Sequence, residues 1–406
     1  MSSSDLSFDW DILPHLSSAP RLREAALQSR SNSSLSTSSS LKENAPLHSP
    51  SSTATSVTTL SAKQQVQEVN LASFEILKYL GAGSFAQVYL VRHIRTQKLL
   101  ALKTMRKSSI LKYKKKNHVF SELRILERLA SQKYQCPYIC PLVFAFHSPN
   151  KLYLAFEFLS GGELYFHLRR RGRMPESLSR FYACEIVLAL GYLHSLSICY
   201  RDLKPENLVL DSMGHLNLID FGLSVDLRKT EKVSGSAGTT DYLAPEALLA
   251  NEADQGLALD WWAFGMVVFE MLTGLPPWSS PDKVLVVQGI LHGLVDDLDF
   301  GTMSCSARDL ISSLLIRDPA SRLGAGGTRE VMSHPFFSNV DWIRVAKRGY
   351  EPPFIPPRDL DEDDIPGLCN FDAENVSLQI KQPSPLDFQN CTSDDEFEGF
   401  CFQLLE

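Results

Sequence analysis

The chain has 406 residues, of which 44% are hydrophobic and 21% are charged, so it can form one large domain or two to three smaller ones. Its formal net charge of −7 gives no reason to expect a nucleic-acid partner. No run of about 18 apolar residues occurs, so no membrane span is expected. The start, Met1-Ser2-Ser3-Ser4, carries neither a myristoylation glycine nor a secretory signal pattern.

The eight cysteines are scattered through the chain. Cys136 and Cys140 lie close together around Pro137, and we interpret them as ordinary loop and strand residues rather than as a metal pair. The spacing fits neither a zinc site nor the disulfide framework of a small secreted protein. We therefore expect a reducing compartment, the cytoplasm and also the nucleus.

Serine and threonine dominate the first seventy residues. Residues 31–61 contain few large apolar side chains and show no periodicity, so they cannot bury enough surface to offset the entropy of ordering, and we predict disorder. Residues 8–13 mix aromatic and acidic side chains, and they are equally well explained as a docking segment or as an isolated apolar patch. Folded structure is expected from about Phe74.

A glycine-containing stretch follows the first predicted strand, which covers residues 74–77. Residues 80–90 read Leu-Gly-Ala-Gly-Ser-Phe-Ala-Gln-Val-Tyr-Leu. Glycine lets the backbone approach a phosphate closely, so that N–H groups can hold it. Val88 stands where an apolar side chain would cover a purine. The residues predicted to bind phosphate are Gly81, Ala82, Gly83, Ser84 and Phe85.

The next predicted strand is apolar and ends in Lys103. An unpaired ammonium on a buried strand would be unfavourable, so Lys103 needs an acidic partner. Glu122 lies in a predicted helix over residues 119–126, and we predict a Lys103–Glu122 ion pair. We include Ala101, on the same strand as Lys103, among the nucleotide-binding residues.

Polar side chains gather in residues 200–207, Tyr-Arg-Asp-Leu-Lys-Pro-Glu-Asn, shortly before Asp220-Phe221-Gly222. Asp202 can accept a hydroxyl proton. Asn207 and Asp220 offer the hard oxygen ligands that Mg²⁺ prefers when it also binds phosphates. Phosphoryl transfer needs an oriented nucleophile, neutralised phosphates and a positioned γ-phosphate. The stretch therefore predicts a phosphoryl-transfer site that binds Mg²⁺ and a γ-phosphate.

These motifs, in this order, resemble those of eukaryotic protein kinases, and of the AGC group in particular. The resemblance implies an α+β, bilobal fold, with a small antiparallel-sheet lobe and a mostly helical large lobe. It implies a protein serine/threonine kinase in which Asp202, Lys204 and Asn207 are catalytic. It divides the chain into an N-terminal region (1–73), a catalytic domain (74–337) and an AGC tail (338–406).

The same resemblance assigns the hinge between the lobes to residues 152–163. It implies that backbone groups of Glu157 and Leu159 pair with adenine, and that Phe156 is the gatekeeper. Glu163 would meet the ribose or a substrate arginine. One departure is Ala86, which replaces the family's third glycine and from which we expect slower or weaker ATP handling.

The large lobe should contain a long helix over residues 179–195, where apolar side chains recur every three to four positions. A second buried helix is predicted to start at Asp260, which either binds backbone N–H groups of the catalytic loop or simply caps the helix. The resemblance also implies an ion pair between Glu246 and Arg322.

The activation segment, residues 220–246, departs from the AGC pattern twice. Gly235 replaces a threonine that is usually phosphorylated, and Val225 replaces a lysine that helps to hold the phosphate. Because phosphate orders such loops by pairing with basic groups, we hypothesise that activation needs no loop phosphate. The competing hypothesis is that phosphorylation of Ser234 or Ser236 substitutes.

Three acidic residues, Glu163, Glu206 and Glu270, match positions that AGC kinases use to bind arginines upstream of the target. Carboxylates fit the guanidinium group with paired hydrogen bonds. We therefore expect protein substrates with Ser or Thr preceded by Arg. We also expect a monomer, with an upstream kinase or a scaffold as a further partner.

Residues 338–406 are rich in proline and acidic residues and match the AGC tail that wraps over the small lobe. Phe371 and Asp372 resemble the element that visits the adenine pocket. Residues 397–402, Phe-Glu-Gly-Phe-Cys-Phe, resemble the hydrophobic motif that fills a groove beside the Glu122 helix; a tail end without docking is the alternative. Cys401 stands where the motif usually carries a phosphorylated Ser or Thr.

A pseudokinase that acts as a scaffold is the competing function from another class. Ala86 and the altered activation segment favour it. The presence of the full catalytic set favours the active enzyme instead; these residues are Lys103, Glu122, Asp202, Asn207 and Asp220.

Overall fold

The computed structural model describes residues 69–83, 86–132, 135–229, 240–249, 256–359, 365–371, 385–388 and 396–404. All the described residues belong to one unit of the chain. The segments predicted to be disordered or to dock through residues 8–13 lie outside the described residues.

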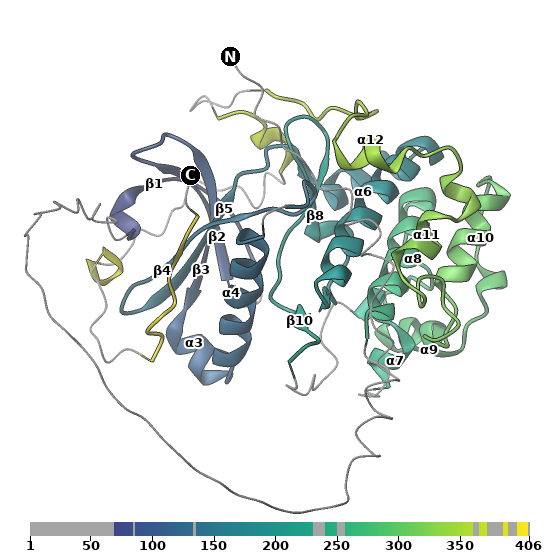
Figure 1. Cartoon of the computed structure of the whole chain (residues 1–406), viewed down its shortest axis with the longest axis horizontal. Helices are drawn as coiled ribbons and strands as arrows, with labels where there is room; N and C mark the ends of the chain where they lie inside the picture. Colours follow the sequence, from purple (N-terminus) through teal and green to yellow (C-terminus); the bar gives the residue numbers. More distant parts are fainter. Residues whose placement is uncertain are drawn as a thin grey trace, which may run out of the picture. The chain divides into compact units, whose positions relative to one another are not determined.

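A six-stranded antiparallel sheet forms the small lobe, in the order β1-β2-β3-β5-β4-β11 (Figure 1). The strands are β1 (Phe74–Ala82), β2 (Ala86–His93), β3 (Leu99–Arg106), β4 (Leu142–His147), β5 (Lys151–Glu157) and β11 (Phe402–Gln403). The described residues include a short 3₁₀ helix before Phe74, η1 (Leu71–Ser73), which Asn70 caps and in which Leu71 is buried.

Both faces of this sheet are covered, as strand β5 illustrates. Successive side chains of a strand point to opposite faces. Leu152 and Leu154 belong to the main hydrophobic core that includes helix α4 (Lys116–Ala130). Tyr153 and Ala155 pack in a separate cluster on the other face. The continuous apolar run of β5 follows from this burial on both sides.

Helix α4 lies against the sheet through one apolar side, after the short helix α3 (Lys107–Lys112). Val119, Leu123 and Leu126 are buried and recur at helical spacing. The helix extends beyond the predicted residues 119–126 at both ends. Its first turn is polar and gives no periodic pattern, whereas Leu129 and Ala130 at its end are buried and continue the apolar pattern beyond the predicted range.

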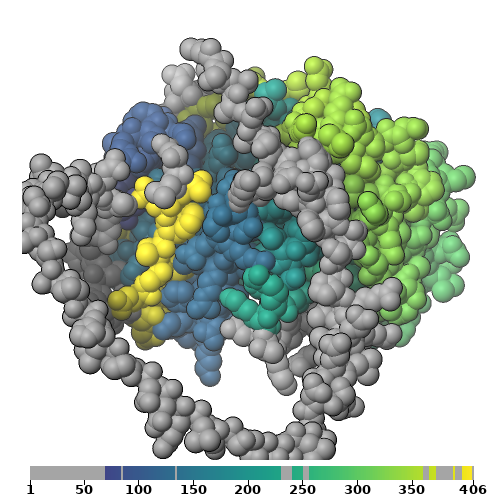
Figure 2. All heavy atoms as spheres, in the orientation of Figure 1, coloured from purple at the N-terminus to yellow at the C-terminus, as the bar shows by residue number. Residues whose placement is uncertain are grey.

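The end of the tail lies along the small lobe, where it is coloured yellow beside blue atoms in Figure 2. Strand β11 pairs with β4, with Phe402 opposite Ala145. Phe397 and Phe400 are buried in the core that contains α4. The predicted docking of the tail end is therefore confirmed, and Cys401 between the last two rings is exposed.

The large lobe is mostly helical (Figure 1). Its described α-helices are α5 (Leu164–Arg171), α6 (Glu176–Ser195), α7 (Pro245–Leu248), α8 (Ala258–Thr273), α9 (Lys283–His292), α10 (Cys305–Leu314) and α11 (Thr328–Met332), and α12 (Trp342–Ala346) follows at the start of the tail. None of the helices that the structure describes has both the length and the apolar character needed to cross a membrane. The predicted bilobal α+β fold is confirmed.

Two helix starts differ from the predictions. Helix α6 begins at Glu176 rather than at Ser179, because Pro175 fixes the chain just before it and Glu176 holds the backbone N–H and the hydroxyl of Ser304 at 2.9 and 2.8 Å. Helix α8 begins before Asp260, which therefore lies in the first turn and not at the cap position.

Short strands flank the catalytic loop and the start of the activation segment. Strands β6 (Gly162–Glu163), β8 (Leu208–Leu210) and β9 (Leu216–Leu218) form one sheet, and β7 (Ile198–Cys199) pairs with β10 (Val225–Asp226). The 3₁₀ helices of this lobe and of the tail are η2 (Pro205–Asn207), η3 (Thr240–Tyr242), η5 (Val295–Asp297), η6 (Pro335–Phe337), η7 (Leu368–Asn370) and η8 (Pro385–Phe388).

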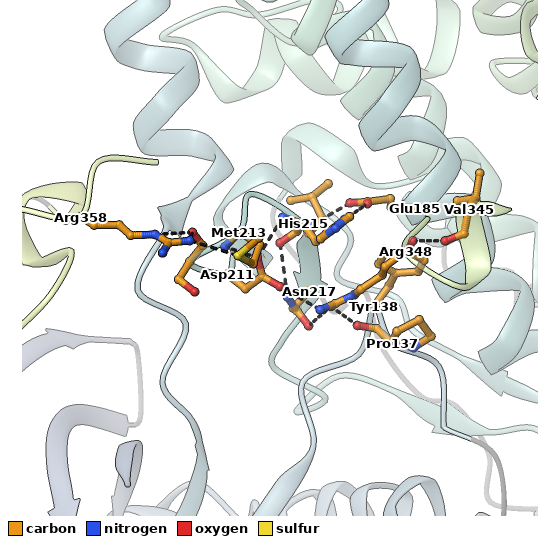
Figure 3. A network of polar contacts seen from close by, with 12 residues as sticks. Pro137, Tyr138, Glu185, Asp211, Met213, His215, Asn217, Val345, Arg348 and Arg358 are labelled. Atoms are coloured by element: carbon orange, nitrogen blue, oxygen red, sulfur yellow. Dashed lines mark hydrogen bonds and ion pairs between the residues drawn. The ribbon is translucent and has the colours of Figure 1, made fainter. Parts of the chain in front are cut away.

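The start of the tail is fastened to the β8–β9 hairpin through Arg348 (Figure 3). Arg348 Nη1 lies 2.9 Å from Asp211 Oδ2, and Nη2 lies 3.2 Å from Asn217 Oδ1 and also donates to the Pro137 carbonyl. Beside it, His215 is bonded to the buried Glu185 at 2.6 Å. The network fixes the hairpin that leads into Asp220.

Candidate active site

A cavity of about 370 Å³ is lined by residues of the glycine stretch, β3, the hinge and the catalytic loop. The predicted nucleotide and metal residues that line it are Gly81, Ala82, Gly83, Val88, Ala101, Lys103, Phe156, Glu157, Leu159, Glu163, Asn207 and Asp220. Five further lining residues were not predicted to bind nucleotide: Leu80, Cys140, Phe158, Val209 and Ile219. Leu80 and Val209 lie on strands and the other three lie in adjoining loops, and only the folded chain brings all five to the cavity.

The glycine stretch forms the turn between β1 and β2. Gly83 N donates to the Ala86 carbonyl at 2.9 Å, and Gly81 lies opposite Val88 in the register. A Cβ added at Gly81 or Gly83 would meet no described atom within 4 Å, so internal packing does not require glycine there. Close approach of a ligand to the backbone explains both glycines better. Ser84 and Phe85 lie outside the described residues.

Lys103 joins the two lobes at the inner end of the cavity. Its ammonium lies 2.7 Å from Glu122 Oε1 on α4 and 2.9 Å from Asp220 Oδ1, which follows β9. The predicted ion pair with Glu122 is therefore present. Burial alone would lower the pKa of Lys103, but the carboxylates of Asp220 and Glu122 raise it above its ordinary value, so the group stays charged.

Asp220 presents its carboxylate to the cavity from an uncommon backbone conformation, with φ at 57°. Such strain is typical of functional sites. Its described hydrogen bonds, from Lys103 and Gly222, all go to Oδ1, and its side chain is 43% exposed. The Lys103 charge lowers the pKa of Asp220 below its usual range, so the group is a carboxylate.

The catalytic loop places three polar side chains together. Lys204 Nζ lies 2.8 Å from Asp202 Oδ2, and Asn207 Nδ2 donates to the same oxygen and to the Asp202 carbonyl, each at 2.8 Å. Because Asn207 donates through Nδ2, its Oδ1 is available as a ligand atom on the cavity side. Burial raises the pKa of Asp202, which favours a role in accepting a proton.

Asp260 binds the backbone at the start of the catalytic loop. Its Oδ2 accepts from Tyr200 N at 2.9 Å and its Oδ1 from Arg201 N at 2.8 Å, and His194 Nε2 lies 2.8 Å from Oδ2. Asp260 is fully buried. Of the two alternatives from the sequence, binding of the catalytic-loop N–H groups is the one found.

The protein kinase domain family matches residues 74–337 of the chain. The chain belongs to the protein kinase family. Serine/threonine-protein kinase YPK1 of Saccharomyces cerevisiae is 42% identical over 308 residues, which cover 75% of this chain and 43% of that protein. Serine/threonine-protein kinase gad8 of Schizosaccharomyces pombe is 40% identical over 315 residues, or 77% of this chain and 53% of its own.

Ribosomal protein S6 kinase beta of Caenorhabditis elegans is 39% identical over 337 residues, which cover 81% of this chain and 59% of that protein. The kinase chain spans about half the length of these three curated relatives. They confirm the resemblance to AGC-group serine/threonine kinases.

The end of the activation segment is anchored in the large lobe of the kinase. Arg322 is buried and binds Glu246 through two hydrogen bonds of 2.7 and 3.0 Å, so the predicted ion pair is present. Residues 230–239 lie outside the described residues, and with them the predictions for Ser234, Gly235 and Ser236.

Three acidic residues are predicted to bind substrate arginine, and Glu206 affects the protonation of the other two, Glu163 and Glu270. Burial, then the Glu206 carboxylate, raises the pKa of Glu163 to about 7. Burial, with Glu206 and Asp241 nearby, raises the pKa of Glu270 to about 7, although Tyr242 donates to Glu270 at 2.6 Å. Glu206 Oε2 is buried without a hydrogen-bond partner in the described part of the chain.

The tail contributes one side chain to the cavity wall of the kinase. Phe371 lines the cavity and stacks on Phe158 of the hinge, with ring centroids 5.7 Å apart and an angle of 21°. Phe371 therefore lies in the nucleotide pocket as predicted, whereas Asp372 lies outside the described residues. Nucleotide binding and the position of the tail should be linked.

Proposed function

We propose that the chain transfers the γ-phosphate of ATP to Ser or Thr of protein substrates that carry upstream arginines. The observation that carries this proposal is the position of the Lys103 ammonium, held between Glu122 of the small lobe and Asp220 of the large lobe. It lies on the wall of the same cavity as Asn207 and the glycine turn. That arrangement supplies the positioning that phosphoryl transfer requires.

The chain's own residues would divide the work as follows. Backbone N–H groups around Gly81 and Gly83 cradle the phosphates, and Lys103 orients them. Asp202 orients the substrate hydroxyl and accepts its proton. Lys204, which is bonded to Asp202, would offset the charge of the transferred group.

Mg²⁺ fits the oxygen atoms of Asn207 and Asp220 because both side chains face the cavity and Asp220 is charged and half exposed. Bound there, Mg²⁺ would neutralise charge on the triphosphate. The two residues are too few to satisfy an octahedral ion alone, which matches a metal that also takes phosphate oxygens and water.

Arginine selectivity follows from the three carboxylates beside the catalytic loop. Glu206 Oε2 is buried and lacks a hydrogen-bond partner among the described residues, and an unpaired buried oxygen is unfavourable. A substrate guanidinium would supply the missing donors in paired geometry. Its positive charge would also relieve the repulsion among Glu163, Glu206 and Glu270.

An arginine-scanned peptide array with ATP and Mg²⁺ tests this proposal. We expect Ser and Thr peptides to be phosphorylated best with Arg two to five positions before the acceptor, and we expect Asp220→Ala to abolish the signal. A preference for proline or acidic residues would contradict the substrate class. Absence of transfer by the unmodified chain would favour the scaffold function.

The proposal extends to the setting of the enzyme. We propose a monomer that works in intracellular signalling, in the cytoplasm and also the nucleus, with an upstream kinase or a scaffold as a further partner. Size-exclusion chromatography with light scattering and localisation of a tagged full chain test these points.

A further inference from the structure

Asp226, on strand β10, is a nearly buried carboxylate with two arginine partners. Its side chain is 6% exposed. Arg228 binds it in a paired arrangement, with Nε 2.9 Å from Oδ1 and Nη2 2.7 Å from Oδ2. Arg128 Nη1 approaches the same Oδ2 at 3.2 Å. These hydrogen bonds, chiefly from Arg228, lower the pKa of Asp226, so the carboxylate is charged.

The backbone around Asp226 is fixed to the catalytic loop. Asp226 lies opposite Ile198 in the β7–β10 pair, and Leu227 N donates to the Ser197 carbonyl at 2.9 Å. On the other side, the Ser224 hydroxyl donates to the Tyr200 carbonyl at 3.1 Å. Strand β7 leads directly into Tyr200, so Asp226 moves with the segment that carries Asp202.

Arg128 comes from the other lobe. It lies near the C-terminal end of α4, the helix that carries Glu122, and α4 contacts β10. The Arg128 side chain is 20% exposed, so its interaction with Asp226 is screened less than a surface ion pair. A helix is stiff over a few turns, so holding one end limits how far Glu122 can swing.

Arg228 and Arg128 bind Asp226 from different parts of the chain. Arg228 is two residues from Asp226 on the same segment and by itself supplies a bidentate partner. Arg128 is therefore not needed to neutralise the carboxylate, and it brings a second positive charge close to Arg228. What Arg128 adds is a connection between α4 and the start of the activation segment.

We propose that the Arg128–Asp226 ion pair positions helix α4, and through it the Glu122–Lys103 contact, for the phosphoryl transfer proposed above. Both residues are positioning residues, and the inference rests on that proposed function. The contact is made by unmodified side chains of the chain, so it orders α4 against the activation segment without a phosphate. The Asp226 carboxylate would thus provide the negative charge that a phosphorylated residue provides in other activation segments.

Kinetics of the full chain with ATP, Mg²⁺ and an arginine-containing peptide test this proposal. We expect Arg128→Gln and Asp226→Asn each to lower kcat/KM about tenfold, and the double variant to be no worse than either alone, because both remove one shared contact. Arg128→Lys keeps the charge and should retain more activity than Arg128→Gln. Arg124→Ala, an exposed arginine one turn earlier on α4, is the matched control and should stay within about twofold of the unmodified chain.

Hydrogen exchange of the α4 amides provides a readout that does not depend on activity. We expect faster exchange around Glu122 in Arg128→Gln than in Arg124→Ala, with melting temperatures that remain similar. Unchanged exchange, or additive kinetic losses in the double variant, would overturn the role of the pair. If the unmodified chain transfers no phosphate, the proposed function fails, and the exchange comparison still decides whether Arg128 holds the helix.

Discussion

The rings of Phe120 and Phe397 lie nearly parallel, with centroids 6.1 Å apart and an angle of 9° between their planes. Phe120 belongs to α4 and Phe397 to the end of the tail. The ammonium groups of Lys107 and Lys116 lie over the Phe397 ring at 5.3 and 5.6 Å, and Lys116 also reaches Glu396 at 3.4 Å. The tail therefore contacts the helix that carries Glu122, and it does so through unmodified side chains.

Loss of the tail rings should lower activity by loosening α4. Phe400→Ala removes a fully buried ring, and truncation before Phe397 removes both rings; we expect kcat/KM to fall about tenfold in each case. Cys401→Ala is the control, because the thiol is exposed and cannot carry the usual phosphate. Steady-state kinetics with one peptide decide the matter, and a truncated chain with full activity would show that docking has no catalytic role.

The contact between Lys103 and Glu122 should matter more for chemistry than for stability. Glu122→Gln keeps the size of the side chain but removes the charge that positions Lys103, so we expect kcat/KM to fall about 100-fold or more with little change in melting temperature. Glu127→Gln on the same helix is the control. Comparable losses of kcat/KM in both variants would mean that any loss of a carboxylate from α4 impairs the enzyme, and this result would contradict a specific role of Glu122.

Substrate binding should depend on pH near neutrality. Glu163 and Glu270 each have a pKa of about 7, so both are largely protonated at about pH 6 and largely charged at about pH 8. We expect KM for an arginine-containing peptide to fall roughly tenfold over this range, because only the charged forms attract guanidinium. A peptide without arginine serves as the control. Parallel KM profiles for the two peptides would contradict the assignment.

The same carboxyl groups should make the fold less stable as pH rises. The pKa of Glu163 is raised in the folded chain, so the folded state holds this proton more tightly than the unfolded state does. Its unfavourable contribution therefore appears between the ordinary pKa of 4.5 and the folded value of about 7, and is complete above that range. We expect Glu163→Gln to melt higher than the unmodified chain at about pH 8, and the difference to vanish at about pH 4. Thermal melts across this range measure it, and a constant difference would contradict the prediction.

Activation should not require phosphate on the activation segment. Chain made in bacteria with Ser234→Ala and Ser236→Ala should keep most of its rate, because the Arg128–Asp226 and Glu246–Arg322 pairs anchor the segment on both sides of residues 230–239. The measurement is peptide phosphorylation by the double variant beside the unmodified chain. A loss of more than about 100-fold would show that one of the two serines must be phosphorylated.

The sequence predicted an ion pair where a buried charged side chain needs a partner of opposite charge and a nearby element offers one. Lys103 on a buried strand needs a nearby acid, and Glu122 was the acid on the following helix. The ion pairs from Lys151 to Asp387, at 2.8 Å, and from Arg128 to Asp226 were not predicted. The chain has 40 lysines and arginines, and no local pattern tells which of them a distant acid will meet once the tail and the activation segment are folded.

Element boundaries were predictable only where the apolar pattern reaches the end of an element. The predicted start of α6 at Ser179 was wrong because its first turn is defined by Pro175 and by the contact of Glu176 with Ser304, which lies on another helix's cap. The cavity wall was only partly predictable for a similar reason. Val209 lies on β8 and Ile219 directly follows β9, but whether their side chains line the cavity depends on how the lobes meet.

The most direct test of the account is transfer of radioactive γ-phosphate from ATP to an arginine-containing serine peptide, with and without Mg²⁺, by the full chain and by Asp220→Ala and Lys103→Met. We predict transfer by the unmodified chain with Mg²⁺ only, and a loss of about 1,000-fold or more in both variants. Equal incorporation by Asp220→Ala, or none by the unmodified chain, would contradict the account.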